Sequence, residues 1–245
     1  MSTNACDLEA VRRFEFSELK TLLPEPPCRV LEVGGHDGLQ ASLLAALGYE
    51  VVSVDTAPAA KQAQHFPVIK YDGTKLPFPA QSFELIFSSN VLEHVAHFSK
   101  LQSEFARVLA PRGLGLHVLP SSTWRLWTSI THPVRIIRGG LGILRRRMSP
   151  PSEAGTNSRT WRWRHLLFPD RHGEKGNAIT ELYWFSEFAW RRRFRQSGWS
   201  TLQVLEMPLF YTGQLSLGRW LNTKHRQMLA RVLGGASKIY RVKPS

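Results

Sequence analysis

Glycines and carboxylates follow two apolar segments of the chain at a spacing that suits a nucleoside-containing cofactor. Gly34 and Gly38 come just after the apolar run that begins at Val30, and Asp55 ends the next apolar run. Glycine lets a ligand approach the backbone closely, and a carboxylate can accept hydrogen bonds from both ribose hydroxyls. No G-x-G-x-x-G sequence accompanies them, which makes a nicotinamide cofactor a weaker interpretation. These residues indicate an enzyme.

Two of three histidines considered are candidates for a general base, which a hydroxyl acceptor needs when it loses its proton. Histidine has an unperturbed pKa near neutrality. His172 lies in a polar stretch where Glu174 could orient it, although the whole stretch could also be solvated. His132 precedes a proline inside a basic segment, and His94 is interpreted as structural at the start of a predicted helix. An amine or carboxylate acceptor would need no such base.

The elements that must position these residues follow from the apolar pattern. Five strands are predicted in the first half of the chain: Val30–Gly34, Glu50–Asp55, Pro67–Tyr71, Ser82–Ser88 and Gly113–Leu119. Apolar residues at helical spacing predict a first helix after the first strand: Leu39, Leu43, Leu44 and Leu47. This helix is expected to end near Gly48. Strands that alternate with helices predict a mostly parallel sheet covered on both faces.

Further helices and two closing strands are predicted after the fourth strand. One helix runs from Phe98 to Leu109, with a capping box of Ser99 and Gln102 and a stop at Pro111. The later elements are a helix from Ser186 to Gln196, strands at Leu202–Glu206 and Leu209–Thr212, and a terminal helix at Leu215–Leu233. The sequence therefore predicts an α/β, Rossmann-like fold with a seven-stranded sheet, in one domain over residues 1–245.

Residues 121–180 interrupt this alternation and are predicted to be an insertion after the fifth strand. Eleven basic residues against three acidic ones lie in residues 124–177, which accounts for most of the net charge of +13. Four tryptophans lie there too: Trp124, Trp127, Trp161 and Trp163. The insertion could be a lid over the active site, an element on an anionic membrane surface, an RNA-binding segment, or a partly buried insertion with solvated arginines. Its isoleucines and leucines favour the lid or the membrane over RNA.

The order of these elements and the residues at their ends resemble the class I S-adenosylmethionine-dependent methyltransferases, specifically the type 11-like domain. Two segments carry the resemblance: Leu76-Pro77-Phe78-Pro79 through Asn90-Val91-Leu92-Glu93-His94-Val95, and Ala106-Arg107-Val108-Leu109-Ala110-Pro111-Arg112-Gly113. The resemblance covers residues 28–121 well and 180–206 weakly. It departs at position 36, where the family usually has glycine and this chain has His36, which could adopt an unusual backbone angle.

The resemblance implies roles for particular residues in binding S-adenosylmethionine. Glu32 would help to anchor the methionine end of the cofactor, often through water, and Asp55 would bind the ribose hydroxyls. Asp72 would accept from the adenine amino group while Gly73 allows contact, and Asn90 would lie beside the cofactor sulfur. Together with Gly34 and Gly38 these residues are the predicted cofactor site, and no metal site is predicted.

The predicted function is methyl transfer from S-adenosylmethionine to a hydroxyl of a sugar or glycan precursor or of another small metabolite, which a lipid phosphate could carry. His172 and His132 are the candidate bases. Two alternatives remain: an RNA methyltransferase or RNA-binding protein, and a non-catalytic, membrane-associated protein that binds the cofactor. The chain has only two cysteines, no secretory signal pattern and no long apolar run, so a cytoplasmic location is expected, with peripheral contact at the inner membrane face as an option.

Overall fold

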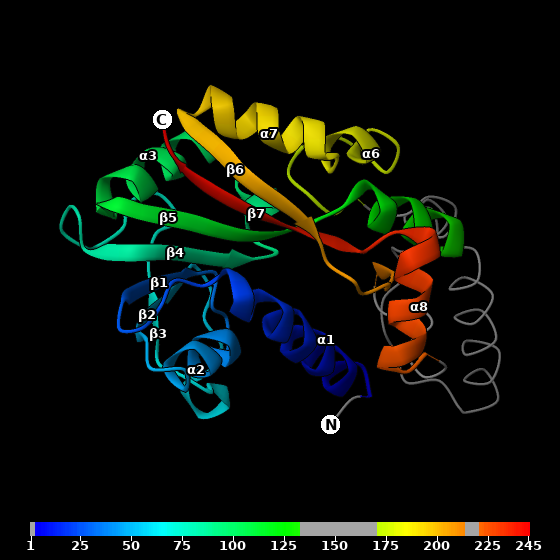
Figure 1. Ribbon diagram of the computed structural model, residues 1–245, viewed down its shortest axis with the longest axis horizontal. Coiled ribbons are helices and arrows are strands. Elements are labelled where there is room, and N and C mark those ends of the chain that lie inside the picture. Colours follow the sequence, from blue (N-terminus) through cyan, green and yellow to red (C-terminus); the bar gives the residue numbers. More distant parts are fainter. Residues whose placement is uncertain (1–2, 133–170, 214–220) are drawn as a thin grey trace, which may run out of the picture.

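The computed structural model describes residues 3–132, 171–213 and 221–245. At its centre these residues form a sheet of seven strands in the order β3-β2-β1-β4-β5-β7-β6 (Figure 1). The strands are β1 (Arg29–Val33), β2 (Glu50–Asp55), β3 (Val68–Lys70), β4 (Phe83–Ser89), β5 (Leu109–Pro120), β6 (Trp199–Glu206) and β7 (Ser237–Pro244). The predicted seven-stranded, Rossmann-like sheet is confirmed.

The first five strands run parallel, and β7 runs antiparallel between β5 and β6. Leu31 of β1 pairs with Val52 of β2 on one side and with Ile86 of β4 on the other. The strand order therefore reverses between β1 and β4. In open α/β sheets, ligands bind beyond the carboxyl ends of the strands at such a reversal.

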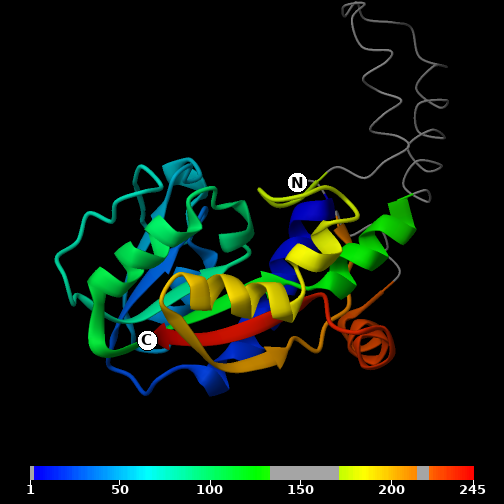
Figure 2. The same cartoon turned by 90° about the horizontal axis from the view of Figure 1, so that it is seen from above.

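Helices cover both faces of this sheet. They are α1 (Thr3–Leu19), α2 (Leu39–Ala45), α3 (Phe98–Val108), α6 (Glu181–Trp184), α7 (Glu187–Gln196) and α8 (Thr223–Leu233), with short helices η1 (Lys20–Leu22), η2 (Lys61–Ala63) and η3 (Leu92–His94). Residues 122–132 are helical as well. Figures 1 and 2 show α3 and α7 along one face of the sheet and α2 on the other. Such cover is what a mostly parallel sheet requires.

Aromatic side chains pack the space between the sheet and the helices α3 and α7. Phe98 of α3 meets Phe194 of α7 with ring centroids 5.6 Å apart. The buried ring of His117 in β5 lies stacked between Phe105 and Phe194, and its Nδ1 is 2.8 Å from the hydroxyl of Ser88 in β4. Burial lowers the pKa of His117 to about 3, so the ring is neutral and belongs to the core. This packing fixes the carboxyl ends of β4 and β5, where site residues follow.

Several local predictions are confirmed by the structure. Ser186 caps α7 because its side chain accepts a hydrogen bond from the backbone N–H of Ala189, and the helix ends at Gln196 as expected. Gly48 follows α2 with a φ of 91°, in the left-handed region that glycine tolerates best. His36 has a φ of 47°, which is the unusual backbone angle anticipated where the family carries glycine.

Other local predictions are wrong. The cap of α3 is His97, without a side-chain hydrogen bond, so Ser99 and Gln102 form no capping box. This helix ends at Val108, and Pro111 lies within β5 instead of stopping the helix. The segment Leu209–Thr212 is no strand, although its residues are buried. The last strand is β7, after α8, and neither β7 nor α1 was predicted.

The terminal helix and the insertion are only partly described. Thr223–Leu233 form α8, whose first turn is capped by the side chain of Asn222, while residues 214–220 lie outside the described residues. Of the predicted insertion 121–180, the structure describes residues 121–132, which include the helix at 122–132, and the loop at 171–180. Its arginine cluster at 145–147 and two of its tryptophans, Trp161 and Trp163, lie outside the described residues.

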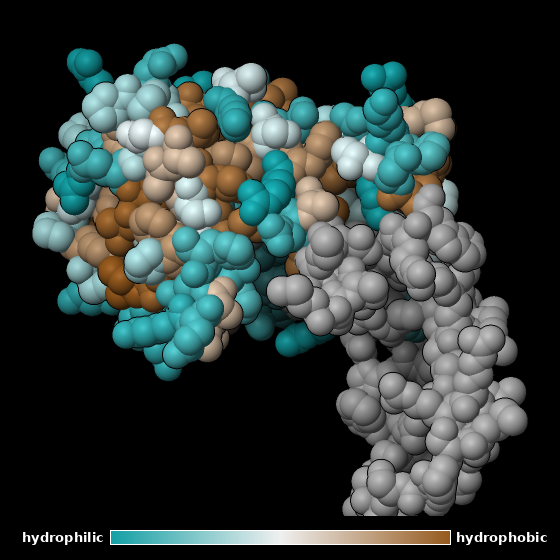
Figure 3. Space-filling view, turned by 90° about the horizontal axis from the view of Figure 1, so that it is seen from below, coloured by the Kyte–Doolittle hydropathy of each residue, from teal (hydrophilic) through white to brown (hydrophobic). Residues whose placement is uncertain are grey.

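The surface of the described residues is mixed in polarity. On the face seen from below, hydrophilic residues surround smaller groups of hydrophobic residues (Figure 3). Among the described residues, no helix combines the length and the apolar character that crossing a bilayer requires.

Candidate functional site

A cavity of about 490 Å³ opens beyond the carboxyl ends of β1, β2, β3 and β4. Five of the residues predicted to bind the cofactor line it: Gly34, Asp55, Asp72, Gly73 and Asn90. The rest of its wall consists of His36, Thr56, Tyr71, Thr74, Val91 and the segment His94–His97. Residues that are far apart in the sequence therefore meet where the strand order reverses, as the sequence predicts.

Gly34 allows the turn after β1 to close against the segment that follows β4. Its φ is 82°, and a Cβ atom at this position would lie 2.2 Å from Cγ2 of Val91. The backbone N–H groups of Gly34 and Gly35 both donate to the carbonyl of Val54 in β2. A side chain at position 34 would therefore displace Val91 and occupy part of the cavity, which both residues line.

Asp55 is the last residue of β2, and each of its carboxylate oxygens accepts a hydrogen bond from the backbone of a turn, one after β1 and one after β2. Its Oδ2 accepts from the backbone N–H of His36 at 2.9 Å, and its Oδ1 accepts from Ala57 at 2.7 Å. Each carboxylate oxygen has two lone pairs, so capacity for two ribose hydroxyls is left. Asp55 thus ties the two turns together at the cavity wall.

Asp72 and Gly73 follow β3 and also line the cavity. Oδ1 of Asp72 accepts from the backbone N–H groups of Thr74 and Lys75, at 2.7 and 2.8 Å. These hydrogen bonds, with Lys75 first, lower the pKa of the exposed Asp72 carboxyl below its usual value. The group is therefore an ionised acceptor near neutral pH, which is the chemistry that an adenine amino group requires.

Asn90 follows β4 and lies in the left-handed region with a φ of 55°. Asparagine tolerates this conformation better than most residues. Its backbone N–H donates to the carbonyl of Val118 in β5, and its side chain donates to the hydroxyl of Ser89. Asn90 lines the first cavity and also a second one.

Glu32 and Gly38 were predicted to bind the cofactor, but they do not line the cavity. Glu32 is buried below the turn and accepts a hydrogen bond from the hydroxyl of Ser53 at 2.6 Å. Burial raises the pKa of its carboxyl to about 7. Gly38 packs against the backbone of Phe66, which a Cβ atom would approach to 2.4 Å. Gly38 therefore shapes the turn, and the role of Glu32 at the methionine end stays a prediction.

A second cavity of about 460 Å³ adjoins the first and shares two of its residues, Asn90 and His94. Its other lining residues come from five parts of the chain: Leu8, Arg12, Pro120, Trp124, His172, Tyr211, Thr212 and Gly213. The wall combines aromatic rings with a guanidinium and two imidazoles. Its size suits a small organic molecule.

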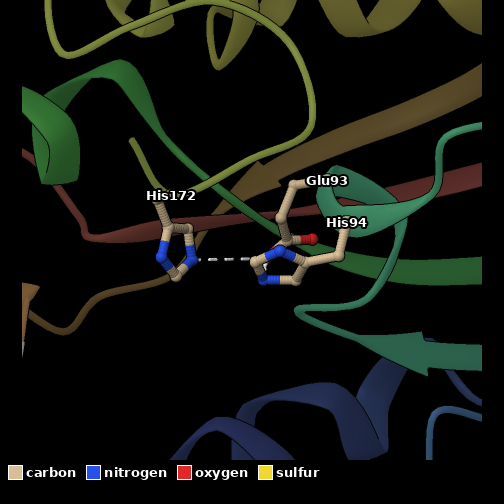
Figure 4. Close-up of side chains that lie close together, drawn as sticks. All are labelled: Glu93, His94 and His172. Atoms are coloured by element: carbon tan, nitrogen blue, oxygen red, sulfur yellow. Dashed lines mark ion pairs between the residues drawn. The ribbon is translucent and has the colours of Figure 1, made fainter. Parts of the chain in front are cut away.

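Glu93, His94 and His172 form a cluster at the border of the two cavities (Figure 4). Nε2 of His94 and Nε2 of His172 each lie 3.8 Å from Oε1 of Glu93. The two imidazole rings meet edge to face with centroids 4.8 Å apart, and His172 also contacts Trp124. The three side chains come from η3 and from the loop before α6.

Burial sets the charges of this cluster. It raises the pKa of the Glu93 carboxyl to about 8. It also lowers the pKa of His172 to about 4, and the neighbouring His94 and nearby arginines lower that pKa further. Burial lowers the pKa of His94 as well. The contacts at 3.8 Å are therefore not charge pairs near neutral pH. A neutral imidazole at this border can accept a proton from a bound hydroxyl.

Of the two predicted bases, the structure brings only His172 to the border of the cavities. His132 is buried at the end of the helix at 122–132 and lines neither of the two cavities. Its catalytic role therefore stays a prediction, as does that of His172. Glu174, suggested as an orienting partner for His172, instead pairs with Arg171 at 3.8 Å. The predicted lid, membrane and RNA roles fall largely on residues 133–170, outside the described residues.

The sequence did not predict several residues of the site. His94 was interpreted as structural, and Glu93 was noted only as part of the motif. Arg12 and Tyr211 also line the second cavity, Arg12 from α1 and Tyr211 from the loop after β6. The pair Glu93-His94 directly after the Asn90 turn was the available signal, since the carboxyl end of a parallel strand is where ligands bind. No local signal pointed to Arg12 or Tyr211.

Comparison with known proteins gives the class of protein. Residues 8–204 match the methyltransferase domain family, which is most of the chain. The chain therefore belongs to the methyltransferase domain family, and the resemblance found in the sequence is confirmed.

Curated relatives match the chain over part of its length, and two of them serve as examples. An uncharacterized methyltransferase of Mycobacterium sp. (strain JLS) is 37% identical over 102 residues, which is 39% of each chain. A ubiquinone biosynthesis O-methyltransferase of Bartonella tribocorum is 32% identical over 116 residues, 44% of this chain and 47% of the relative. The matches thus span less than half of the length of these relatives.

Solved structures share the fold over nearly the whole chain. An S-adenosylmethionine-dependent methyltransferase from Mesorhizobium loti superposes with a TM-score of 0.54 at 16% identity, covering 95% of this chain and 98% of the other. The 1,6-didemethyltoxoflavin-N1-methyltransferase of Burkholderia thailandensis, solved with S-adenosylhomocysteine, gives 0.55 at 13% identity, covering 97% and 79%. At such identities the likeness is one of fold.

Proposed function

We propose that this chain transfers a methyl group from S-adenosylmethionine to an oxygen atom of a small hydroxylated acceptor. The single observation that supports this most is that two cavities of similar size share Asn90 and His94. Methyl transfer is an in-line displacement, so donor and acceptor must meet at one point while water is excluded. The shared border provides such a point.

The first cavity is the proposed site for the cofactor. Its ribose would lie against Asp55, its adenine against Asp72 and Gly73, and its sulfur near Asn90. Glu32, below the Gly34 turn, would support the ammonium of the methionine end through a bridging water. The cofactor supplies the reactive methyl, and the protein supplies alignment.

The second cavity is the proposed site for the acceptor. Trp124, Tyr211 and His172 offer ring faces and edges, and Arg12 offers a cation at the wall. Such a wall suits a flat or ring-shaped molecule with polar substituents, which includes a sugar or glycan precursor, free or carried on a lipid phosphate. The O-methyltransferase of ubiquinone biosynthesis among the relatives supports a hydroxyl as the acceptor group.

His172 is the proposed acceptor of the proton. The acceptor oxygen would form a bond to the methyl carbon while the carbon–sulfur bond breaks, and S-adenosylhomocysteine would leave. The hydroxyl proton would pass to Nε2 of His172. The loop that carries His172 is attached to η3 close by. The backbone N–H of Glu174 in this loop donates a hydrogen bond to the carbonyl of Glu93 at 2.8 Å.

The test combines binding and transfer. Calorimetry with S-adenosylmethionine and S-adenosylhomocysteine should give one binding site per chain. Cell-extract fractions incubated with the protein and methyl-labelled cofactor should then reveal one small-molecule fraction that gains the label. Absence of cofactor binding would refute the proposal. Label that appears only in RNA would show that the acceptor is RNA and not a small molecule.

A further inference from the structure

We propose that Glu93, His94 and His172 bind a divalent transition-metal cation at the border of the two cavities. One carboxylate and two imidazoles converge there, and their ligand atoms all lie within 4.8 Å of one another. Figure 4 shows the three side chains turned toward a common point. The binding of the cation stands by itself, while its part in methyl transfer rests on the function proposed above.

The ligand atoms lie close to the separations that a bound cation requires. A cation at about 2.0–2.2 Å from each ligand holds its ligand atoms roughly 3–3.5 Å apart. The two imidazole nitrogens lie 3.8 Å from Oε1 of Glu93. His94 is half exposed and His172 is partly exposed, so both rings have room to turn. Each imidazole nitrogen would have to approach Oε1 of Glu93 by less than about 1 Å, and the widest separation in the cluster, up to 4.8 Å, would have to close by about 1–2 Å.

Glu93 is a second, independent indication of a ligand. Its side chain is fully buried, and neither carboxylate oxygen makes a hydrogen bond to another of the described residues. Buried carboxylate oxygens without hydrogen bonds are costly and uncommon in native proteins. A cation between Glu93 and the two histidines would satisfy Oε1 and remove that cost.

The donor set selects the class of cation. Two imidazole nitrogens and one carboxylate suit Zn²⁺, Fe²⁺ or Co²⁺, whereas Mg²⁺ and Ca²⁺ prefer oxygen ligands throughout. Three protein ligands also leave open coordination positions, as in catalytic zinc sites. Here both histidines line the acceptor cavity, and His94 also lines the cofactor cavity.

The consequence for the proposed reaction concerns the hydroxyl. A cation in this position would bind the acceptor oxygen at an open coordination position and lower the pKa of its proton. With the cation bound, Nε2 of His172 is a ligand, so the proton would leave to solvent water; without the cation it would pass to His172 as proposed above. The oxygen would form its bond to the methyl carbon as the carbon–sulfur bond breaks, and S-adenosylhomocysteine would leave.

The test is a titration of tag-free, chelator-treated full-length protein with Co²⁺, followed by absorption spectroscopy and calorimetry, with Zn²⁺ as competitor. We expect one Co²⁺ per chain, displaced by Zn²⁺ and not by Mg²⁺. His94→Ala and His172→Ala should each weaken binding at least about tenfold. His225→Ala, which removes an exposed histidine of α8, is the matched control and should bind as the unchanged chain does.

One further variant and one further measurement make the outcome decisive. Glu93→Gln removes the carboxylate at similar volume and should weaken Co²⁺ binding as the histidine variants do. His94 is exposed enough that its replacement should leave the fold intact, so thermal melting of His94→Ala separates loss of a ligand from loss of structure. Absence of stoichiometric binding, or equal binding by the cluster variants and His225→Ala, would overturn the proposal. The titration needs neither cofactor nor acceptor, so its result is independent of the proposed methyl transfer.

Discussion

The carboxylate of Glu181 fixes the backbone of His172. Its Oε1 accepts hydrogen bonds from the N–H groups of His172 and Gly173, both at 2.7 Å, and its Oε2 lies 3.0 Å from Nε of Arg125. Glu181 and Arg125 are both buried. A buried charge pair of this kind is costly to disturb and holds its surroundings in one arrangement. The loop that carries His172 is thereby tied to α6 and to the helix at 122–132.

His172→Ala should abolish turnover and keep cofactor affinity. Loss of a general base or of a metal-held hydroxyl lowers rates by about 10²–10⁴-fold. His172 does not line the cofactor cavity, so calorimetry with S-adenosylmethionine should give an unchanged dissociation constant. The measurement is methyl transfer to the acceptor identified by the labelled-cofactor screen, with His225→Ala as control. Full activity of His172→Ala would remove this residue from the chemistry.

Glu181→Gln should lower kcat while KM for the cofactor stays the same, because it acts through the position of His172. Charged hydrogen-bond acceptors contribute about 1.5–3 kcal/mol, so a fall in kcat of about tenfold or more is expected. Glu187→Gln is the matched control, since Glu187 also bridges cations, Arg191 and Lys238, but lies on α7 and lines neither of the two cavities. If both variants lost kcat in proportion to their melting temperature, the effect would be one of stability alone.

Asp55→Ala should weaken binding of S-adenosylmethionine by about 10- to 100-fold, since two hydrogen bonds to a carboxylate are lost. Calorimetry measures this directly. Glu50→Gln is the control, because Glu50 begins the same strand, β2, at the opposite end and is exposed. Equal affinity of Asp55→Ala and the unchanged chain would refute the assignment to the ribose.

The cofactor side of the site was predictable because its residues belong to local motifs. The strands β1, β2 and β4 are largely apolar runs, and a site residue stands at or directly after the end of each, as with Asp55 at the end of β2 and Asn90 after β4. A parallel sheet then brings such residues together at one edge. Gly34 and Gly73 were found in the same way, and both have the positive φ that favours glycine.

The acceptor side was less predictable because it depends on contacts between distant segments. His172 meets Glu93 only through the fold of the loop before α6, and no spacing in the sequence encodes that contact. Leu209–Thr212 was mistaken for a strand because a buried apolar run has no period that excludes one. The strand β7 was missed because its apolar run is interrupted by basic residues, Lys238, Arg241 and Lys243, although it pairs with strands on both sides.

Gly34→Ala should destabilise the protein more than the same change at Gly198. Both glycines have a positive φ, 82° and 76°, so both variants bear the strain of the left-handed region, about 1–2 kcal/mol. Only at position 34 would the new Cβ atom collide, with Cγ2 of Val91, while nothing lies within 4 Å at position 198. Thermal denaturation measures the difference, and Gly34→Ala combined with Val91→Ala should recover part of it. Equal melting temperatures of the two single variants would show that Val91 moves freely.

Binding of S-adenosylmethionine should strengthen as the pH rises from about 6 to about 8. Burial raises the pKa of Glu32 to about 7, so its carboxyl is protonated at the lower pH and ionised at the higher one. The ammonium of the cofactor is attracted to the ionised form, so its affinity rises as Glu32 loses its proton and levels off above the raised pKa. Calorimetry over this range measures the slope, and Glu32→Gln, which keeps an acceptor for the hydroxyl of Ser53, should bind more weakly and lose the slope. A slope that persists in Glu32→Gln would assign the dependence to another group.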